Sequence, residues 1–176
     1  RFIAATLVAV NFRERYVTVW NGGNPGPLLV RPDGAVRLHF NRHHLPLGVV
    51  DDDEFDGTVD SHVVNPHDHL LLFSDGLIEL EDAADKALGV DGLGEVLNGL
   101  PAAARLPRLT EIVHRLTGGN PPRDDISIAS KRYLLSRVSL PGLAVAVERV
   151  PALRSAFPVT VGQPVDADVI FAGRDT

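Results

Sequence analysis

The first 73 residues alternate between apolar runs and turn-forming residues, a pattern typical of β-strands joined by short loops. Pro32, Asp33 and Gly34 separate two of these runs and form a strong hairpin signal, because glycine accepts a positive φ. The last run is short and wholly apolar, as expected of a strand that is buried on both faces. We therefore expect strands at residues 2–10, 15–20, 27–31, 35–40 and 69–73 and within residues 54–64.

Helical spacing replaces this pattern after Gly76. Residues 77–99 are mixed, and we expect helical stretches there that are broken by the glycines at positions 89, 92 and 94. Residues 102–117 carry apolar side chains at helical spacing, and Gly118 and Gly119 then end the helix. Residues 126–130 return to a strand. Several antiparallel strands, a helical insert and a closing strand predict a layered α+β domain.

The bulk composition narrows the class of protein. At 176 residues, with 44% hydrophobic and 23% charged residues, the chain fits one soluble domain with an appendage. A formal net charge of -6 argues against nucleic-acid binding, which needs clustered Lys and Arg. The absence of cysteine excludes disulfides, thiolate metal sites and a cysteine nucleophile. No apolar run is long enough to span a membrane, and we expect a cytoplasmic protein with no membrane partner.

Residues 134–176 differ from the rest of the chain, and we assign them separately from residues 1–133. They contain four prolines, a candidate short helix around residues 142–156, and no motif. A docking tail, extra strands and the start of another domain are all compatible with this stretch.

Two carboxylate motifs stand next to predicted strands. The motif of Ser74, Asp75 and Gly76 directly follows the apolar strand, so Asp75, backed by the glycine, projects from a rigid element. Asp124 and Asp125 directly precede the closing strand, and a bound cation is the simplest relief of their mutual repulsion. Ligation by oxygen alone suits hard ions such as Mg²⁺ or Mn²⁺. Each motif alone is more often a turn or a solvated cap than a metal ligand. It is the occurrence of both motifs, in this order, that indicates a metal site.

Four blocks in order resemble the catalytic domain of SpoIIE-type phosphatases, a bacterial branch of the PPM (protein phosphatase 2C-like) metal-dependent serine/threonine phosphatases. Residues 21–29 are similar to the family's Asn-Ala-Gly-His-Pro-Pro-Pro-Leu-Leu block, and residues 45–49 contain its Pro-Leu-Gly element. Residues 66–79 resemble its Pro-Gly-Asp block, which ends in Thr-Asp-Gly-hydrophobic-x-Glu. Residues 123–127 match its closing Asp-Asp-hydrophobic-Thr block. The resemblance covers residues 1–133 and corresponds to the C-terminal half or more of that domain.

The resemblance implies a PPM-type β-sandwich flanked by helices, in four α-β-β-α layers, with a two-metal site at one edge. Two ions, Mn²⁺ or Mg²⁺, would hold and deprotonate a water that attacks the phosphorus of a phosphoserine or phosphothreonine. The expected metal-site residues are Asp75, Gly76, Asp124 and Asp125. Of these, Asp75 and Asp124 would be direct ligands, and Asp125 would support the turn or the ligands. Glu79 either shapes the loop that leaves the site or is a helix-start carboxylate.

The chain departs from the family pattern in three places. The family's earlier motifs, an aspartate and an Asp-hydrophobic-x-Gly-His-Gly element that supplies the metal-bridging carboxylate, are absent. They would lie upstream of Arg1, in an N-terminal part that is missing from this chain. Asn24 stands where the family usually has histidine. His67 stands where it usually has a turn glycine, so the turn must avoid a positive φ or accept strain.

These observations support two functions. The leading one is a metal-dependent serine/threonine phosphatase, the output domain of a bacterial response regulator, which acts on a phosphorylated anti-anti-sigma-type regulator and can form a homodimer. The alternative is a catalytically inactive, phosphatase-like adaptor that binds a sigma factor or its regulator. The missing motifs and Asn24 favour the adaptor. The two retained carboxylate motifs favour the enzyme, because a decayed site has no physical reason to keep repelling carboxylates.

Overall fold

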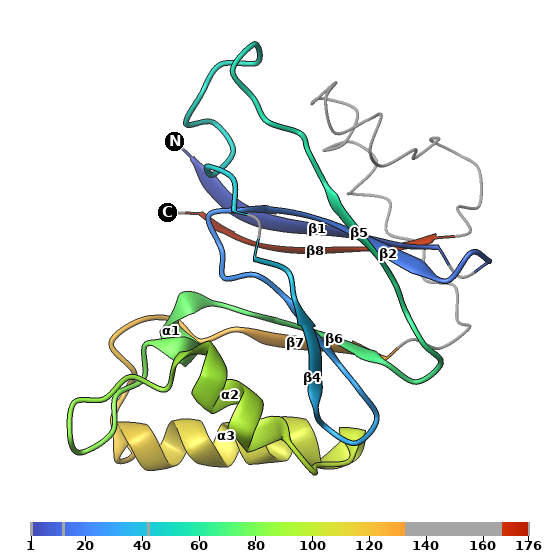
Figure 1. The fold of residues 1–176 in the computed structure, drawn as a ribbon. Coiled ribbons are helices and arrows are strands. Elements are labelled where there is room, and N and C mark those ends of the chain that lie inside the picture. Colours follow the sequence, from blue (N-terminus) through green and yellow to red (C-terminus); the bar gives the residue numbers. More distant parts are fainter. Residues whose placement is uncertain (1, 12, 42, 133–166, 176) are drawn as a thin grey trace. The chain divides into compact units, whose positions relative to one another are not determined.

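The computed structural model describes residues 2–11, 13–41, 43–132 and 167–175 (Figure 1). The chain divides into two compact units, and each has its own four-stranded antiparallel sheet. The first unit comprises residues 1–24, 42–65 and 134–176, and the second comprises residues 25–41 and 66–133. The domain boundary that we place at residue 133 stays a prediction.

The sheet of the first unit has the strand order β5-β2-β1-β8. Its strands are β1 (Ile3–Asn11), β2 (Tyr16–Gly22), β5 (Asp60–Val63) and β8 (Ala167–Asp175). β1 pairs with β2 on one side and β8 on the other, and residues 4–8 are all buried, which explains the unbroken apolar run. β8 is an extra strand from the C-terminal stretch, whereas the candidate helix around residues 142–156 lies outside the described residues.

Asn24 belongs to a ring of hydrogen bonds in this first unit. Thr6 Oγ1 donates to Asn21 Oδ1 (2.6 Å), and Asn21 Nδ2 donates to the Asn24 carbonyl (2.6 Å). Asn24 Nδ2 closes the ring by donating to Thr6 Oγ1 (3.2 Å). Because Thr6 and Asn21 are buried, these bonds satisfy polar groups that would otherwise lose their hydration. Asn24 therefore has a structural role in the turn that follows β2.

The sheet of the second unit has the strand order β4-β3-β6-β7. Its strands are β3 (Leu28–Val30), β4 (Val36–His39), β6 (His69–Phe73) and β7 (Ile128–Arg132). Its helices are α1 (Asp75–Ile78), α2 (Gly89–Leu97) and α3 (Ala102–Thr117). Figure 1 shows α2 and α3 together on one side of this sheet. Among the described residues, no helix is long and apolar enough to cross a bilayer.

The core of the second unit explains why these segments fold as they do. All five residues of β6 are buried between β3 and β7, as its wholly apolar sequence predicts. Residues from every layer meet in one apolar cluster: Leu28, Val30, Leu71, Phe73, Leu77, Leu93, Leu97 and Leu109. Burial of this cluster is the main force that holds the helices on the sheet.

The expected breaks in α2 and the expected start of β7 are wrong. α2 runs through Gly92 and Gly94, which were expected to break it, because Leu93 and Leu97 are fully buried and their packing outweighs the low helix propensity of glycine. β7 begins at Ile128, two residues later than expected. Its expected first residues contact the loop after β6 instead, where the Ser127 amide donates to Ser74 Oγ.

The β3–β4 hairpin is held against the helices by two contacts. Arg105 of α3 is only 3% exposed, and its guanidinium donates to the carbonyls of Arg31, Pro32 (2.9 Å) and Leu100 (3.1 Å). Burial lowers the pKa of Arg105, and the nearby Asp33 carboxylate opposes that shift. At Gly34, where φ is +91°, a Cβ atom would lie 2.0 Å from the Leu97 carbonyl oxygen. Only glycine fits this approach.

The turn before β6 accepts strain at His67, one of the two outcomes that its sequence allows. His67 has a φ of +69°, a conformation that costs a residue with a Cβ about 1 kcal/mol or more. The next residue, Asp68, is 1% exposed and pairs with Arg37 of β4, with Nη1 and Oδ2 2.8 Å apart. This ion pair, in which Asp68 is buried and Arg37 is half-buried, fixes the start of β6 and so holds the strained turn in place.

Gly34→Ala tests the contact between the hairpin and α2. We expect a loss of roughly 3 kcal/mol or more in unfolding free energy, because the new methyl group meets a main-chain carbonyl and φ stays positive. Gly99→Ala is the matched control, since its φ is +75° and nothing lies within 4 Å of the added Cβ. It should lose only about 1 kcal/mol. Urea denaturation measures both, and equal losses would contradict the contact.

Candidate metal centre

Asp75 lies where a buried strand ends. It directly follows Ser74, the N-cap of α1, and β6 before it is buried along its whole length. A single helical turn then brings the Glu79 amide onto the Asp75 carbonyl (3.0 Å). Asp75 itself is partly buried, and the buried strand before it gives its carboxylate a rigid support.

Ser74 joins this strand end to the second carboxylate motif. Its hydroxyl donates to the Asp125 carbonyl (2.8 Å) and accepts from the Ser127 amide (2.9 Å). Its own amide donates to the Ser127 carbonyl (3.0 Å). Three hydrogen bonds thus hold the loop before β7 against the loop after β6, although some fifty residues separate them in sequence.

Gly76 makes the approach of the two loops close. A Cβ atom there would lie 2.7 Å from the Asp125 carbonyl oxygen and 3.3 Å from that of Asp124. The first distance is shorter than real Cβ contacts, so any larger residue would push the loops apart. The two sequence motifs therefore meet through their main chains.

The two carboxylates are oriented by neighbouring amides. Asp75 Oδ1 accepts from the Gly76 amide (3.0 Å), and Asp124 Oδ1 accepts from the Asp125 amide (2.8 Å). Asp124 and Asp125 are both exposed. Asp125 contributes its main-chain carbonyl to the Ser74 contact, while its side chain faces solvent.

The donor set fits a hard divalent cation only in part. Asp75 and Asp124 offer oxygen ligands of the kind that Mg²⁺ and Mn²⁺ prefer. Within the described ranges, however, no group of three or more His, Cys, Asp or Glu side chains is placed to hold a metal ion. Two carboxylates are fewer than the ligands such ions usually take from protein and water.

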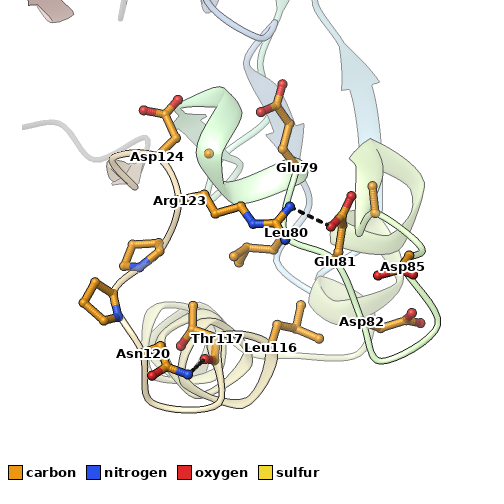
Figure 2. Close-up of a pocket in the computed structure, with 14 residues that line it drawn as sticks. Glu79, Leu80, Glu81, Asp82, Asp85, Leu116, Thr117, Asn120, Arg123 and Asp124 are labelled. Carbon is orange, nitrogen blue, oxygen red and sulfur yellow. Dashed lines mark hydrogen bonds and ion pairs between the residues drawn. The ribbon is translucent and has the colours of Figure 1, made fainter.

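A cavity of about 580 Å³ opens next to this site (Figure 2). Gly76 and Asp124 line one end of it, together with Glu79. In Figure 2 the carboxylates of Asp124 and Glu79 point to the same side, away from the ion pair of Arg123 and Glu81 that spans the cavity. Glu79 is the C-cap of α1, which excludes the reading of it as a helix-start carboxylate.

The profile of Stage II sporulation protein E (SpoIIE) matches residues 1–133, about three quarters of the sequence. The chain belongs to the SpoIIE family. No curated protein matches the chain. The four sequence blocks that suggested the family all lie within the matched residues.

Solved structures of SpoIIE-family and related domains have the same fold. The PP2C phosphatase domain of SpoIIE from Bacillus subtilis, solved with a fragment of its regulatory domain, has a TM-score of 0.54 at 23% identity. The manganese-presoaked phosphatase domain of the same protein gives 0.54 at 19% identity, and the SiaA PP2C domain of Pseudomonas aeruginosa gives 0.53 at 19%. These matches cover 68%, 77% and 69% of this chain.

The comparisons confirm the expected α+β fold of the PPM type. They also show that this chain spans only 35%, 58% and 48% of the three solved chains. At these identities the likeness establishes the fold, and activity, substrate and partners need separate support.

Ser74 belongs to the first sequence motif, but the sequence predicted no role for it in the site. It was visible only as the residue before Asp75, and a serine there reads as an ordinary helix cap. In the structure it makes no side-chain cap hydrogen bond and contacts the second motif instead. One feature could have pointed to Ser74: it carries a hydroxyl at the end of a buried strand, where it can bond to the main chain of the second motif.

Gly76→Ala tests the main-chain contact between the two motifs. We expect it to lower the unfolding free energy by roughly 2–4 kcal/mol, because the Asp125 carbonyl must move. Gly94→Ala is the matched control: it also lies in a helix, and its Cβ would meet only Val36 at an ordinary 3.4 Å. The control should be neutral or gain up to about 1 kcal/mol. Thermal and urea unfolding compare the two, and an unaffected Gly76→Ala would refute the contact.

Proposed function

We propose that this chain is part of a metal-dependent protein phosphatase that hydrolyses phosphoserine or phosphothreonine. The observation that carries the proposal is the contact of Ser74 and Gly76 with Asp125, which holds the Asp75 and Asp124 motifs together. Membership of the SpoIIE family and the PP2C fold support the same reaction class.

The proposed cofactor is Mn²⁺ or Mg²⁺, with two ions in the intact centre. When bound, such ions lower the pKa of a coordinated water and stabilise the charge of the phosphoryl group. Asp75 and Asp124 would hold the ions, although the described residues contain no group of three or more acidic, histidine or cysteine side chains placed to hold a metal ion. A solved relative from Bacillus subtilis was presoaked with manganese, which fits this choice of cofactor.

The remaining residues of the site have positioning roles in this proposal. Ser74 and Gly76 fix the distance between the two loops, and the Gly76 and Asp125 amides orient the ligand carboxylates. Asp125 supports the turn through its carbonyl. Glu79 lies at the end of α1 and shapes the opening beside Asp124.

The substrate that we propose is a phosphorylated bacterial signalling protein of the anti-anti-sigma type. The protein would act in the cytoplasm as the output domain of a response regulator, with homodimer formation as a further option. These points rest on the resemblance of the four sequence blocks to SpoIIE-type phosphatases.

An inactive adaptor that binds a sigma factor or its regulator is the second candidate. One observation favours it: in the part of the chain that the structure describes, no third acidic or histidine ligand accompanies Asp75 and Asp124. An adaptor would bind its partner without metal and release no phosphate.

Asp75→Asn in the full-length protein separates the two candidates. We expect manganese-dependent phosphate release from a phosphoserine peptide to fall about 100-fold or more, because a direct ligand supports several kcal/mol of transition-state stabilisation. Asp91→Asn, an exposed aspartate in the first turn of α2, is the control and should keep the wild-type rate. A wild-type protein with no metal-dependent release would instead support the adaptor.

A further inference from the structure

The cavity beside Asp124 has the volume of a ligand-binding site. Its volume of about 580 Å³ lies within the range of about 300–1,000 Å³ that is usual for ligand pockets. Gly76 and Asp124 belong both to its wall and to the proposed metal centre. A molecule held at that centre would therefore have this cavity as its immediate neighbour.

The charged residues in the wall of the cavity are mostly acidic. Among the described lining residues, carboxylates outnumber guanidinium groups five to one, with Arg123 as the single cation against Glu79, Glu81, Asp82, Asp85 and Asp124. The amides of Lys86 and Ala84 donate to Asp82 Oδ1 and lower the pKa of that carboxyl, so it stays ionised. The excess negative charge favours a cationic occupant.

The cavity already accepts one guanidinium, that of Arg123. Arg123 Nη1 lies 3.3 Å from Glu81 Oε2, and Figure 2 shows the side chain reaching across the cavity to this partner. The Arg123 side chain is 92% exposed and that of Glu81 is 42% exposed, so the pair is screened by water and contributes little stability. Such a pair exchanges readily when another cation arrives.

The cavity also suits the aliphatic part of a long basic side chain. Leu80 and Leu116 form part of the lining, and Figure 2 shows both below the Arg123–Glu81 pair. Lysine and arginine bury their methylene groups on apolar surface while the charged end stays near carboxylates and water. The combination of an apolar patch and an ion-pairing carboxylate is what such a side chain requires.

We propose that this cavity is a specificity subsite, in which Glu81 and Asp85 bind a lysine or arginine of the protein substrate close to its phosphorylated residue. The proposal rests on the proposed phosphatase function and names a class of substrate for it, phosphoproteins with a basic residue beside the phosphorylation site. When no substrate is bound, Arg123 forms an ion pair with Glu81. The basic side chain of the substrate displaces Arg123 from this pair.

Three phosphopeptides that differ only by Lys, Gln or Glu next to the phosphoserine test the subsite in the full-length protein with Mn²⁺. We expect kcat/KM to be about 5- to 10-fold higher for the Lys peptide than for the Gln peptide, mainly through KM, and lowest for the Glu peptide. The Lys advantage should shrink as salt rises from 0.05 to about 0.5 M, because salt screens the attraction. Equal kcat/KM values for the three peptides would overturn the subsite.

Two variants that break the same ion pair give opposite predictions. Glu81→Gln should reduce the Lys-to-Gln ratio of kcat/KM, whereas Arg123→Gln should raise it, since the internal competitor is lost. If the pair were only structural, both variants would move the ratio in the same direction or not at all. Glu95→Gln is the control, an exposed carboxylate of α2 that does not line this cavity, and it should leave the ratio unchanged.

A binding measurement keeps the subsite separate from the proposed reaction. Fluorescence anisotropy of the labelled Lys and Gln peptides in EDTA should show tighter binding of the Lys peptide, and Glu81→Gln should abolish the difference. Equal binding of the two peptides would overturn the subsite even for an active phosphatase. The proposed phosphatase would be contradicted if the protein with Mn²⁺ hydrolysed neither a small aryl phosphate nor any of the three peptides. In that case, tighter binding of the Lys peptide in EDTA would still support the subsite.

Discussion

The close contact between Gly76 and the main chain at Asp125 is the constraint on which the candidate site depends. Because Gly76 has no side chain, the loop after β6 and the loop before β7 can pack closely. A Cβ atom at Gly76 would lie only 2.7 Å from the Asp125 carbonyl oxygen. Ser74 then fixes the register of the two loops with hydrogen bonds of 2.8 and 2.9 Å. Asp75 and Asp124 sit on either side of this contact, so their spacing is set by main-chain geometry and not by flexible side chains.

The second unit supplies a rigid support for that contact. β6 is buried along its length, and the apolar cluster around Leu71 and Phe73 holds the helices on the sheet. Arg105 joins α3 to the β3–β4 hairpin through the main-chain carbonyls of Arg31 and Pro32, at the cost of burying a guanidinium. Strain at His67 is tolerated because the ion pair of the buried Asp68 with Arg37 fixes the next residue.

Much of this fold follows from the sequence, because burial leaves a periodic pattern. β6, the β3–β4 hairpin and α3 were all predicted. The predicted end of α3 at Thr117 is the observed one, and Gly118, which caps it, adopts a φ of +60°. α2 was not, since local propensity at Gly92 and Gly94 gives way to the packing of Leu93. The link through Ser74 could not be predicted either. It joins residues about fifty positions apart, and no local pattern records such a contact.

The central claim is that Asp75 and Asp124 bind the same metal centre. The most direct test is a double-mutant cycle on Mn²⁺ affinity, measured by isothermal titration calorimetry with the full-length protein, Asp75→Asn, Asp124→Asn and the double variant. We predict that each single change weakens Mn²⁺ binding at least about tenfold, and that the double change costs less than the sum of the two. Wild-type affinity in either single variant, or strictly additive losses, would contradict a shared centre.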